Sequence, residues 1–453
     1  MGTCEGAPGL VSSLRFLVRL PPPRNIKGGG QAEALDARHG AGQASAMAHF
    51  RLPRLRLPHL RLSRLRPGRT HPGLRALPAL LLLLAAASDT GDPVKVTPAA
   101  LPQAALALPL HIGGRVSVAP GAGASRYRRQ WPATYFEAEM RGDRAFFTLG
   151  PGEAALHLFV DGRRVRELIR PQAGSYAVQG LGPGRHRLRL QVASESQAGP
   201  TGFGGFYAAR DAMAGAPRPR PRQIEFIGDS HTVGYGNRAT TRACTADQVW
   251  ATTDATRAFP ARLAEQIGAD YRVNAISGRG VVRNYDGGTA DTLPAAYPYL
   301  LFDKARADDQ AGWAPQLIVI ALGTNDFSTA LHPGEPWADR AALHAAFEAG
   351  YVRFVQDLRA RNPGAVFILW ATDAHKSEIT RAVASVAGRL HALGETRLAF
   401  LPVTGLDFAA CHAHPSLADH GRIARLLRAA IAARPGLWTH TGSNALPSAR
   451  ASP

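Results

Sequence analysis

The second half of the chain alternates short, continuously apolar runs with longer segments of helical periodicity. The apolar runs are Gln223–Ile227, Tyr271–Ile276, Gln316–Leu322, Ala365–Trp370 and Leu398–Val403. The segments with a helical period are Thr256–Ile267, Ala338–Arg361, Ser377–Leu393 and Leu417–Ala433. Strands buried on both faces read as continuous apolar runs, so the pattern predicts a parallel sheet with helices on each side. Ligands of such sheets bind beyond the carboxyl ends of the strands, which is where functional residues are expected.

Residues 95–215 have a different pattern, in which short alternating or apolar segments are separated by turn residues. Arg144–Leu149, Ala155–Val160 and Arg185–Val192 are examples. Short strands at such spacing predict an all-β jelly roll or sandwich. The Pro-rich segment Ala214–Arg222 marks the boundary to an α/β domain, which we expect over residues 222–438, with a flexible tail at 439–453.

The start of the chain is strongly basic. Residues 1–78 hold 13 Lys and Arg against 3 Asp and Glu, so they supply +10 of the net charge of +19. The remaining surplus is spread over most of the chain, without a zinc finger, an RNP-type motif or a basic region leading into heptads. We therefore predict no nucleic-acid partner and interpret the charge as a solvated basic surface.

An apolar run, Leu77–Ser88, follows Arg75 and ends in small residues, which is the shape of a secretory signal peptide. It is far shorter than the roughly 20 apolar residues that span a bilayer, so no stable membrane span is predicted. We interpret residues 69–88 as a signal peptide and 1–68 as a Pro/Arg-rich leader, either disordered or an over-extension upstream of a start at Met47. The protein is then expected to be secreted or periplasmic.

Export would remove Cys4 and leave Cys244 and Cys411 as an even pair in an oxidising compartment. These two cysteines are candidates for a disulfide. Two unpaired buried thiols are the alternative, because the sequence does not place their Cα atoms within bonding distance.

Four motifs follow the predicted strands, and each supplies a group useful for acyl transfer. Ser230 stands at a strand-to-helix turn, where backbone N–H groups accompany its hydroxyl, although such a Ser is often only a helix cap. Gly278 and Asn325 follow the second and third strands and supply an unscreened N–H and an amide donor for an oxyanion. His414 follows the fifth strand, where its imidazole could accept the Ser230 proton.

These blocks, in this order over residues 223–433, resemble the SGNH (GDSL-like) hydrolase superfamily. Five further sequence motifs are similar to those of carbohydrate esterase family 2. These motifs are Gly228-Asp-Ser-His-Thr-Val-Gly-Tyr-Gly-Asn237, Ser277-Gly-Arg-Gly280, Cys411-x-x-His-Pro, Ser194-Glu-Ser196 and Phe203-Gly-Gly-Phe-Tyr207. The resemblance implies a flavodoxin-like, three-layer SGNH domain behind a jelly roll. It also implies a cofactor-free serine esterase that removes O-acetyl groups from polysaccharides such as xylan and glucomannan.

In this resemblance Ser230 is the nucleophile, His414 is the base, and the Ser230 N–H, Gly278 and Asn325 form the oxyanion hole. Most SGNH enzymes carry an Asp three residues before the His, and relatives often carry one two residues before it. Here Cys411 and His412 occupy those positions. We expect a Ser–His dyad oriented by a backbone carbonyl, with Asp407 or Asp419 as alternative third members of a triad.

Other interpretations remain open from the sequence. His412, His414 and His420 have the spacing of a metal site, but the motifs are explained without metal, so none is predicted. Asp229 and Asp326 are interpreted as loop-bracing acceptors. An esterase or lipase acting on other acyl esters or bacterial glycans, and an inactive carbohydrate-binding protein, are alternative functions. Five aromatic residues near the motifs are candidates for stacking on sugar rings or for core packing: Tyr235, Trp250, Tyr285, Phe327 and Trp370.

Overall fold

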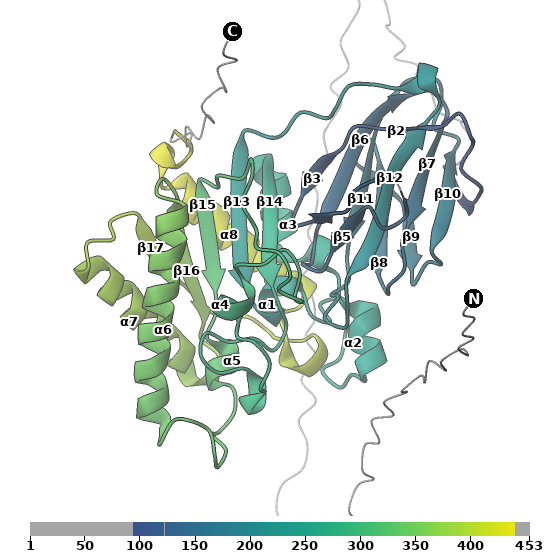
Figure 1. Ribbon diagram of the computed structural model, residues 1–453. Helices are drawn as coiled ribbons and strands as arrows, with labels where there is room; N and C mark the ends of the chain where they lie inside the picture. Colours follow the sequence, from purple (N-terminus) through teal and green to yellow (C-terminus); the bar gives the residue numbers. More distant parts are fainter. Residues whose placement is uncertain (1–93, 122, 440–453) are drawn as a thin grey trace, which may run out of the picture. The chain divides into compact units, whose positions relative to one another are not determined.

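The computed structural model describes residues 94–121 and 123–439, which form an antiparallel β-domain followed by an α/β domain (Figure 1). The predicted leader, the signal peptide and residues 440–453 of the predicted tail lie outside the described residues. Within the described ranges, no helix combines the length and the apolar character needed to cross a membrane.

The β-domain consists of two antiparallel sheets. One has the order β1-β10-β7-β12-β5-β4, with β2 paired to β12, and the other has the order β3-β6-β11-β8-β9. The strands are β1 (Lys95–Pro98), β2 (Leu106–Ala107), β3 (His111–Gly113), β4 (Ser117–Val118), β5 (Tyr127–Arg129), β6 (Tyr135–Arg141), β7 (Arg144–Leu149), β8 (Ala155–Val160), β9 (Arg163–Ile169), β10 (Gly174–Gln179), β11 (Arg185–Val192) and β12 (Thr201–Ala208), followed by a 3-10 turn, η1 (Arg210–Ala212).

Strand β11 shows why the sequence alternates. Leu188 and Leu190 face the core between the two sheets, whereas Arg189 and Gln191 point to the opposite face. That face meets the α/β domain, where the Gln191 amide donates to the Tyr271 hydroxyl at 2.6 Å. One face of the sheet therefore builds the β-domain core, and the other builds the contact between domains.

The α/β domain contains a five-stranded parallel sheet of order β14-β13-β15-β16-β17. The strands are β13 (Arg222–Gly228), β14 (Ala269–Ala275), β15 (Leu317–Ala321), β16 (Val366–Thr372) and β17 (Leu398–Val403). The helices are α1 (Ser230–Val233), α2 (Ala246–Thr252), α3 (Phe259–Ile267), α4 (Leu293–Ala296), α5 (Thr324–Phe327), α6 (Arg340–Arg361), α7 (Glu378–Ala392) and α8 (Leu417–Ala432). The 3-10 turns are η2 (Ala255–Arg257), η3 (Tyr285–Gly287), η4 (His375–Ser377), η5 (Cys411–Ala413) and η6 (Pro435–Trp438).

Helices cover both faces of this sheet. α6 and α7 pack with one set of strand side chains, which includes Ile227 and Ile320. α3 and α8 pack with the alternate set, which includes Phe226 and Val319. In order along the chain the strands lie 2-1-3-4-5, the flavodoxin-like arrangement, so the connections reverse direction between β13 and β15. The predicted fold class, an SGNH-type α/β domain behind an all-β domain, is confirmed.

Buried ion pairs connect the two domains. Arg115 of the β-domain lies 3.3 Å from Glu225 and 2.9 Å from Asp308, and all three side chains are buried. Arg220, a partly exposed residue of the segment between the domains, pairs with Glu137 of the β-domain at 2.8 Å and with Asp270 of β14 at 2.7 Å. Removing one partner of a buried pair leaves an uncompensated charge, so these contacts favour one specific arrangement of the two domains.

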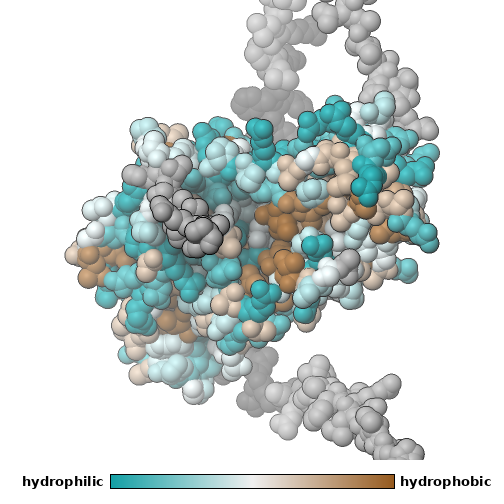
Figure 2. All heavy atoms as spheres, turned by 45° about the horizontal axis from the view of Figure 1, so that its top comes forward, coloured by the Kyte–Doolittle hydropathy of each residue, from teal (hydrophilic) through white to brown (hydrophobic). Residues whose placement is uncertain are grey.

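The face of the molecule drawn in Figure 2 is mainly hydrophilic, with apolar residues in separate patches. Large hydrophobic side chains that are exposed include Val118, Ile169, Tyr285 and Leu393, which come from different elements. Scattered apolar residues of this kind are ordinary on protein surfaces.

Candidate active site

Ser230 and His414 meet beyond the carboxyl ends of the strands. Ser230 is the first residue of α1, directly after β13, and the Asp229 carboxylate caps this turn by accepting from the His231 N–H at 3.0 Å. His414 follows η5, between β17 and α8. Its Nε2 lies 2.9 Å from the Ser230 Oγ, and the Ser230 residue is only 4% exposed. A hydroxyl and an imidazole at this distance can exchange a proton.

The other nitrogen of the His414 ring lies against backbone carbonyls. Nδ1 is 3.0 Å from the Cys411 oxygen and 3.3 Å from the His412 oxygen. A carbonyl only accepts hydrogen bonds, so these contacts favour a proton on Nδ1 and leave Nε2 as the acceptor of the Ser230 hydroxyl proton. Burial lowers the pKa of His414 to about 4, against the opposing effect of the two carbonyls. The imidazole is therefore neutral at neutral pH.

The two carboxylates considered as a third member have other partners. Asp419 caps α8, where it accepts from the Ser416 N–H at 3.0 Å, and it also accepts from the Asp407 and Phe408 N–H groups at 2.9 and 3.0 Å. The Asp407 carboxylate accepts from the Ala409 N–H at 2.9 Å. Within the described chain, the hydrogen bonds recorded for His414 Nδ1 go to the carbonyls alone.

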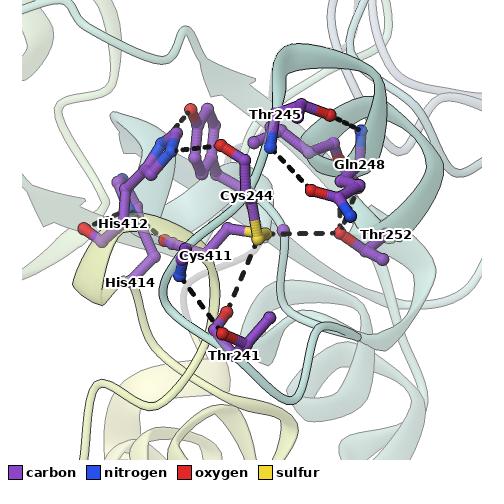
Figure 3. The surroundings of a disulfide bond; sticks show 12 residues. Thr241, Cys244, Thr245, Gln248, Thr252, Cys411, His412 and His414 are labelled. Carbon is purple, nitrogen blue, oxygen red and sulfur yellow. Dashed lines mark hydrogen bonds between the residues drawn. A yellow bond between two sulfur atoms is a disulfide. The ribbon is translucent and has the colours of Figure 1, made fainter.

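The turn that carries His414 is tied to the segment before α2 (Figure 3). A disulfide joins Cys244 to Cys411, with Cα atoms 5.5 Å apart. His412 adds two links, because its N–H donates to the Arg242 carbonyl at 2.7 Å and its Nε2 lies 2.8 Å from the Cys244 oxygen. Gly236 packs against the disulfide so closely that a Cβ there would lie 2.5 Å from the Cys411 Cβ. The sequence allowed either a disulfide between Cys244 and Cys411 or two free thiols, and the structure contains the disulfide.

Gly278 and Asn325 follow β14 and β15, the strands on either side of β13. Gly278 has φ +82°, a backbone conformation that side-chain-bearing residues rarely adopt. Asn325 Nδ2 donates to the Arg279 carbonyl at 2.9 Å and to Asp229 Oδ2 at 3.2 Å. The motifs after the first three strands therefore converge at the point where the connections reverse direction.

Asp326 holds the second and third motifs together. Its buried carboxylate accepts from three successive backbone N–H groups, those of Val281, Val282 and Arg283, at 2.9–3.1 Å. Asp229 and Asp326 thus both brace loops, as the sequence predicted.

The five aromatic candidates separate into surface and core. The Tyr235 ring lies 4.2 Å from the His414 ring, and Tyr285 is 56% exposed. Trp250 has the Arg170 guanidinium over its ring at 4.0 Å. Phe327 and Trp370 are 2% and 1% exposed, so for these two a sugar-stacking role is incompatible with the structure and core packing is the correct interpretation. Phe327 and Trp370 pack against the helices that cover the sheet. The sequence alone did not show that these two side chains are buried by those helices.

His412, His414 and His420, whose spacing in the sequence is that of a metal site, each have a different hydrogen-bond partner. His414 contacts Ser230, and His412 contacts the Cys244 carbonyl. His420 is fully buried in α8, and its Nδ1 accepts from the Phe259 N–H at 3.2 Å. No group of three metal-ligating side chains is found among the residues that the structure describes.

Sequence reasoning gave no role to two polar residues of the β-domain that reach this site. Glu195 and Gln197 lie in the segment after β11, and both hydrogen-bond to the backbone of Ser277, next to Gly278. The signals in the sequence were the polar run Ser194–Gln197 soon after an alternating strand and the resemblance of Ser194-Glu-Ser196 to the esterase family, and neither gives a contact with Ser277.

Comparison with known proteins places this architecture in a family. Residues 112–217 match the model of the carbohydrate esterase 2 N-terminal domain, and residues 226–437 match the GDSL-like lipase/acylhydrolase model. An acetylxylan esterase / glucomannan deacetylase of Cellvibrio japonicus is 41% identical over 333 residues, which cover 73% of this chain and 92% of that protein. The chain belongs to carbohydrate esterase family 2.

Solved structures of the family agree with this assignment. A carbohydrate esterase whose active site is described as having divergent catalytic and non-catalytic binding functions superposes with a TM-score of 0.70 at 40% identity, covering 74% of this chain and all of that one. A family two carbohydrate esterase from Clostridium thermocellum, in complex with cellohexaose, gives a TM-score of 0.63 at 26% identity and covers 72% and 99% of the two chains. This family 2 member is therefore a carboxylic ester hydrolase.

Proposed function

We propose that this carbohydrate esterase removes O-acetyl groups from a xylan- or glucomannan-type polysaccharide. The observation that carries the proposal is the 2.9 Å contact between Ser230 Oγ and His414 Nε2 at the reversal point of the sheet. The substrate class comes from the similarity to the acetylxylan esterase / glucomannan deacetylase. The acceptor of the acyl group in the second half of the reaction is water, so acetate is the expected product.

The proposed reaction is an acyl transfer through Ser230. His414 Nε2 takes the hydroxyl proton while Ser230 Oγ attacks the acetyl carbonyl. The N–H groups of Ser230 and Gly278 and the amide of Asn325 stabilise the tetrahedral oxyanion. The sugar hydroxyl leaves with the proton held by His414, and water then hydrolyses the acyl-enzyme by the same route.

A Ser–His dyad is the proposed form of the catalytic machinery. The role of the Asp in a triad is to hold the imidazole in one tautomer and orientation. The carbonyls of Cys411 and His412 can do this for His414, and the disulfide at Cys411 supports the turn that presents them.

The protein is proposed to be secreted or periplasmic. A disulfide between Cys244 and Cys411 persists in an oxidising compartment, which agrees with the signal peptide expected at residues 69–88.

The test of the proposed function is acetate release by the purified protein from acetylated xylan, acetylated glucomannan and acetylated peptidoglycan, and hydrolysis of aryl esters of increasing acyl length. The Ser230→Ala variant is the control. We expect acetate release that depends on Ser230 and a steep fall in rate with acyl length. A preference for long acyl chains would indicate a lipase, and glycan binding without ester hydrolysis would indicate a binding protein.

The pH dependence of the reaction should report the low pKa of His414. A protonated imidazole cannot accept the Ser230 proton, so kcat/KM should fall as the pH drops through about 4 rather than through the value of about 6.5 of an unperturbed histidine. The measurement is kcat/KM for an aryl acetate between pH 3.5 and 8, limited to conditions in which the protein stays folded.

Asp229 supplies the control for this profile, because burial and the neighbouring Asp326 carboxylate raise the pKa of Asp229 to about 7. An inflection near pH 7 that disappears in Asp229→Asn belongs to Asp229. An acid limb near 6.5 that persists in that variant would contradict the low pKa of His414.

A further inference from the structure

Two side chains of the β-domain hold the backbone that leads into Gly278. Glu195 Oε1 accepts from the Ser277 N–H at 2.7 Å, and Gln197 Nε2 donates to the Ser277 carbonyl at 3.1 Å. The two side chains also contact each other, since Gln197 Nε2 donates to Glu195 Oε1 at 3.0 Å. Ser277 is therefore held on both its N–H and its C=O by residues about 80 positions earlier in the chain.

The hydrogen bond from Gln197 to the Ser277 carbonyl also orients the N–H of Gly278. The Ser277 carbonyl and the Gly278 N–H belong to one planar, trans peptide unit, in which C=O and N–H point in opposite directions. A hydrogen bond to that oxygen therefore sets the direction of the Gly278 N–H.

Gly278 itself does little to hold this peptide unit. A Cβ built on Gly278 would meet no atom within 4 Å, so nothing crowds this position. A glycine also has the widest backbone freedom of any residue. The Tyr285 N–H donates to the Gly278 carbonyl at 2.9 Å, but that oxygen belongs to the next peptide unit. The unit before Gly278 lies inside a turn in which the Arg279 N–H donates to the Ile276 carbonyl at 3.3 Å. The side chain that binds the oxygen of this unit is Gln197, and Glu195 holds the N–H of the unit before it.

The segment that carries Glu195 and Gln197 is itself firmly anchored. Ser194 Oγ accepts from the Ala155 N–H at 2.9 Å, inside the β-domain. The Ser196 carbonyl accepts from Gln130 Nε2 at 3.2 Å, and its hydroxyl accepts from Arg129 at 3.0 Å. Side chains on a segment held in this way reach Ser277 in a fixed geometry.

We propose that Glu195 and Gln197 are positioning residues, through which the β-domain holds the Gly278 N–H in the orientation that stabilises the oxyanion. The β-domain is then part of the catalytic machinery in addition to any contact that it makes with a glycan. This inference rests on the proposed function of Gly278 and extends it to a second domain.

The test compares Gln197→Met, which keeps the length of the side chain and removes the donor, with Gln103→Met, the same change at an exposed position of the β-domain. A displacement of about 1 Å at a reacting centre can cost about 10²-fold. We expect Gln197→Met to lower kcat for an aryl acetate by about 10- to 100-fold, with KM changed less than about threefold. Gln103→Met should leave both constants unchanged.

A second readout separates positioning from a general structural effect. A boronic acid forms a tetrahedral adduct with a serine hydroxyl, so its affinity should fall in Gln197→Met by the same factor as kcat. Glu195→Ala should behave like Gln197→Met, whereas Glu195→Gln keeps an acceptor for the Ser277 N–H and should recover most of the rate. All variants are checked by thermal unfolding.

The inference is overturned if Gln197→Met raises KM and leaves kcat and boronic acid affinity unchanged, or if kcat falls only together with thermal stability and Glu195→Gln gives no recovery. Either result leaves the proposed function intact as long as acetate release in the parent protein depends on Ser230. Loss of that dependence would overturn the proposed function instead.

Discussion

Ser230→Ala and His414→Ala are each expected to lower kcat for acetyl ester hydrolysis by about 10⁴–10⁶, and the double variant should lose no more than either single one. The reason is that, in the proposed mechanism, these two side chains, which lie 2.9 Å apart, act as one unit. Without the imidazole the hydroxyl keeps its proton, and without the hydroxyl the imidazole has no nucleophile to activate. The measurement is kcat with an aryl acetate, and near-additive losses would contradict the shared role.

Asp407→Asn tests whether Ser230 and His414 act as a dyad or need Asp407 as a third member. In a Ser-His-Asp triad, replacing Asp by Asn costs about 10⁴ in kcat because the imidazole adopts the wrong tautomer. Here His414 Nδ1 faces the Cys411 carbonyl, and an Asn at 407 keeps an acceptor for the Ala409 N–H. We therefore expect a change of less than about tenfold. A loss near 10⁴ would show that Asp407 acts as a third catalytic member.

The sheet and the order of its motifs were predictable because their signals are local. β15 and β16 are buried along their whole length and almost entirely apolar, and β13 is buried from Ile224 onward. Buried parallel strands have that appearance in any sequence. Since carboxyl ends of parallel strands share one edge, Ser230 and Asn325 had to lie near each other. The same rule places His414 at this edge of the sheet. Its contact with Ser230 also needs the segment after β17, because β15 and β16 lie between β17 and β13.

The remaining features depend on contacts between distant segments. The burial of Trp370 is decided by packing against Phe259 of α3, which periodicity does not specify. The hydrogen bonds of Glu195 and Gln197 to Ser277 cross from one domain to the other. Such contacts require the orientation of the two domains, which neither composition nor spacing provides.

Asn325→Ala is expected to lower kcat by about 10²–10³ with little change in KM, because an amide donor to the oxyanion acts mainly in the transition state. In the structure, the amide that would donate to the oxyanion already donates to other groups. Both hydrogens of Asn325 Nδ2 already have acceptors, the Arg279 carbonyl at 2.9 Å and Asp229 Oδ2 at 3.2 Å. One of these contacts must be shared or released when the oxyanion forms.

The contact to Asp229 is the one that we expect to give way. It is the longer of the two, and burial raises the pKa of the Asp229 carboxyl to about 7, so this acceptor carries a full negative charge less readily than an ordinary carboxylate. Asp229→Asn should therefore leave most of kcat in place while Asn325→Ala removes it, with both compared by kcat, KM and thermal unfolding. An unchanged kcat in Asn325→Ala would mean that the amide only braces Arg279 and Asp229, and that the oxyanion is stabilised by the backbone N–H groups of Ser230 and Gly278.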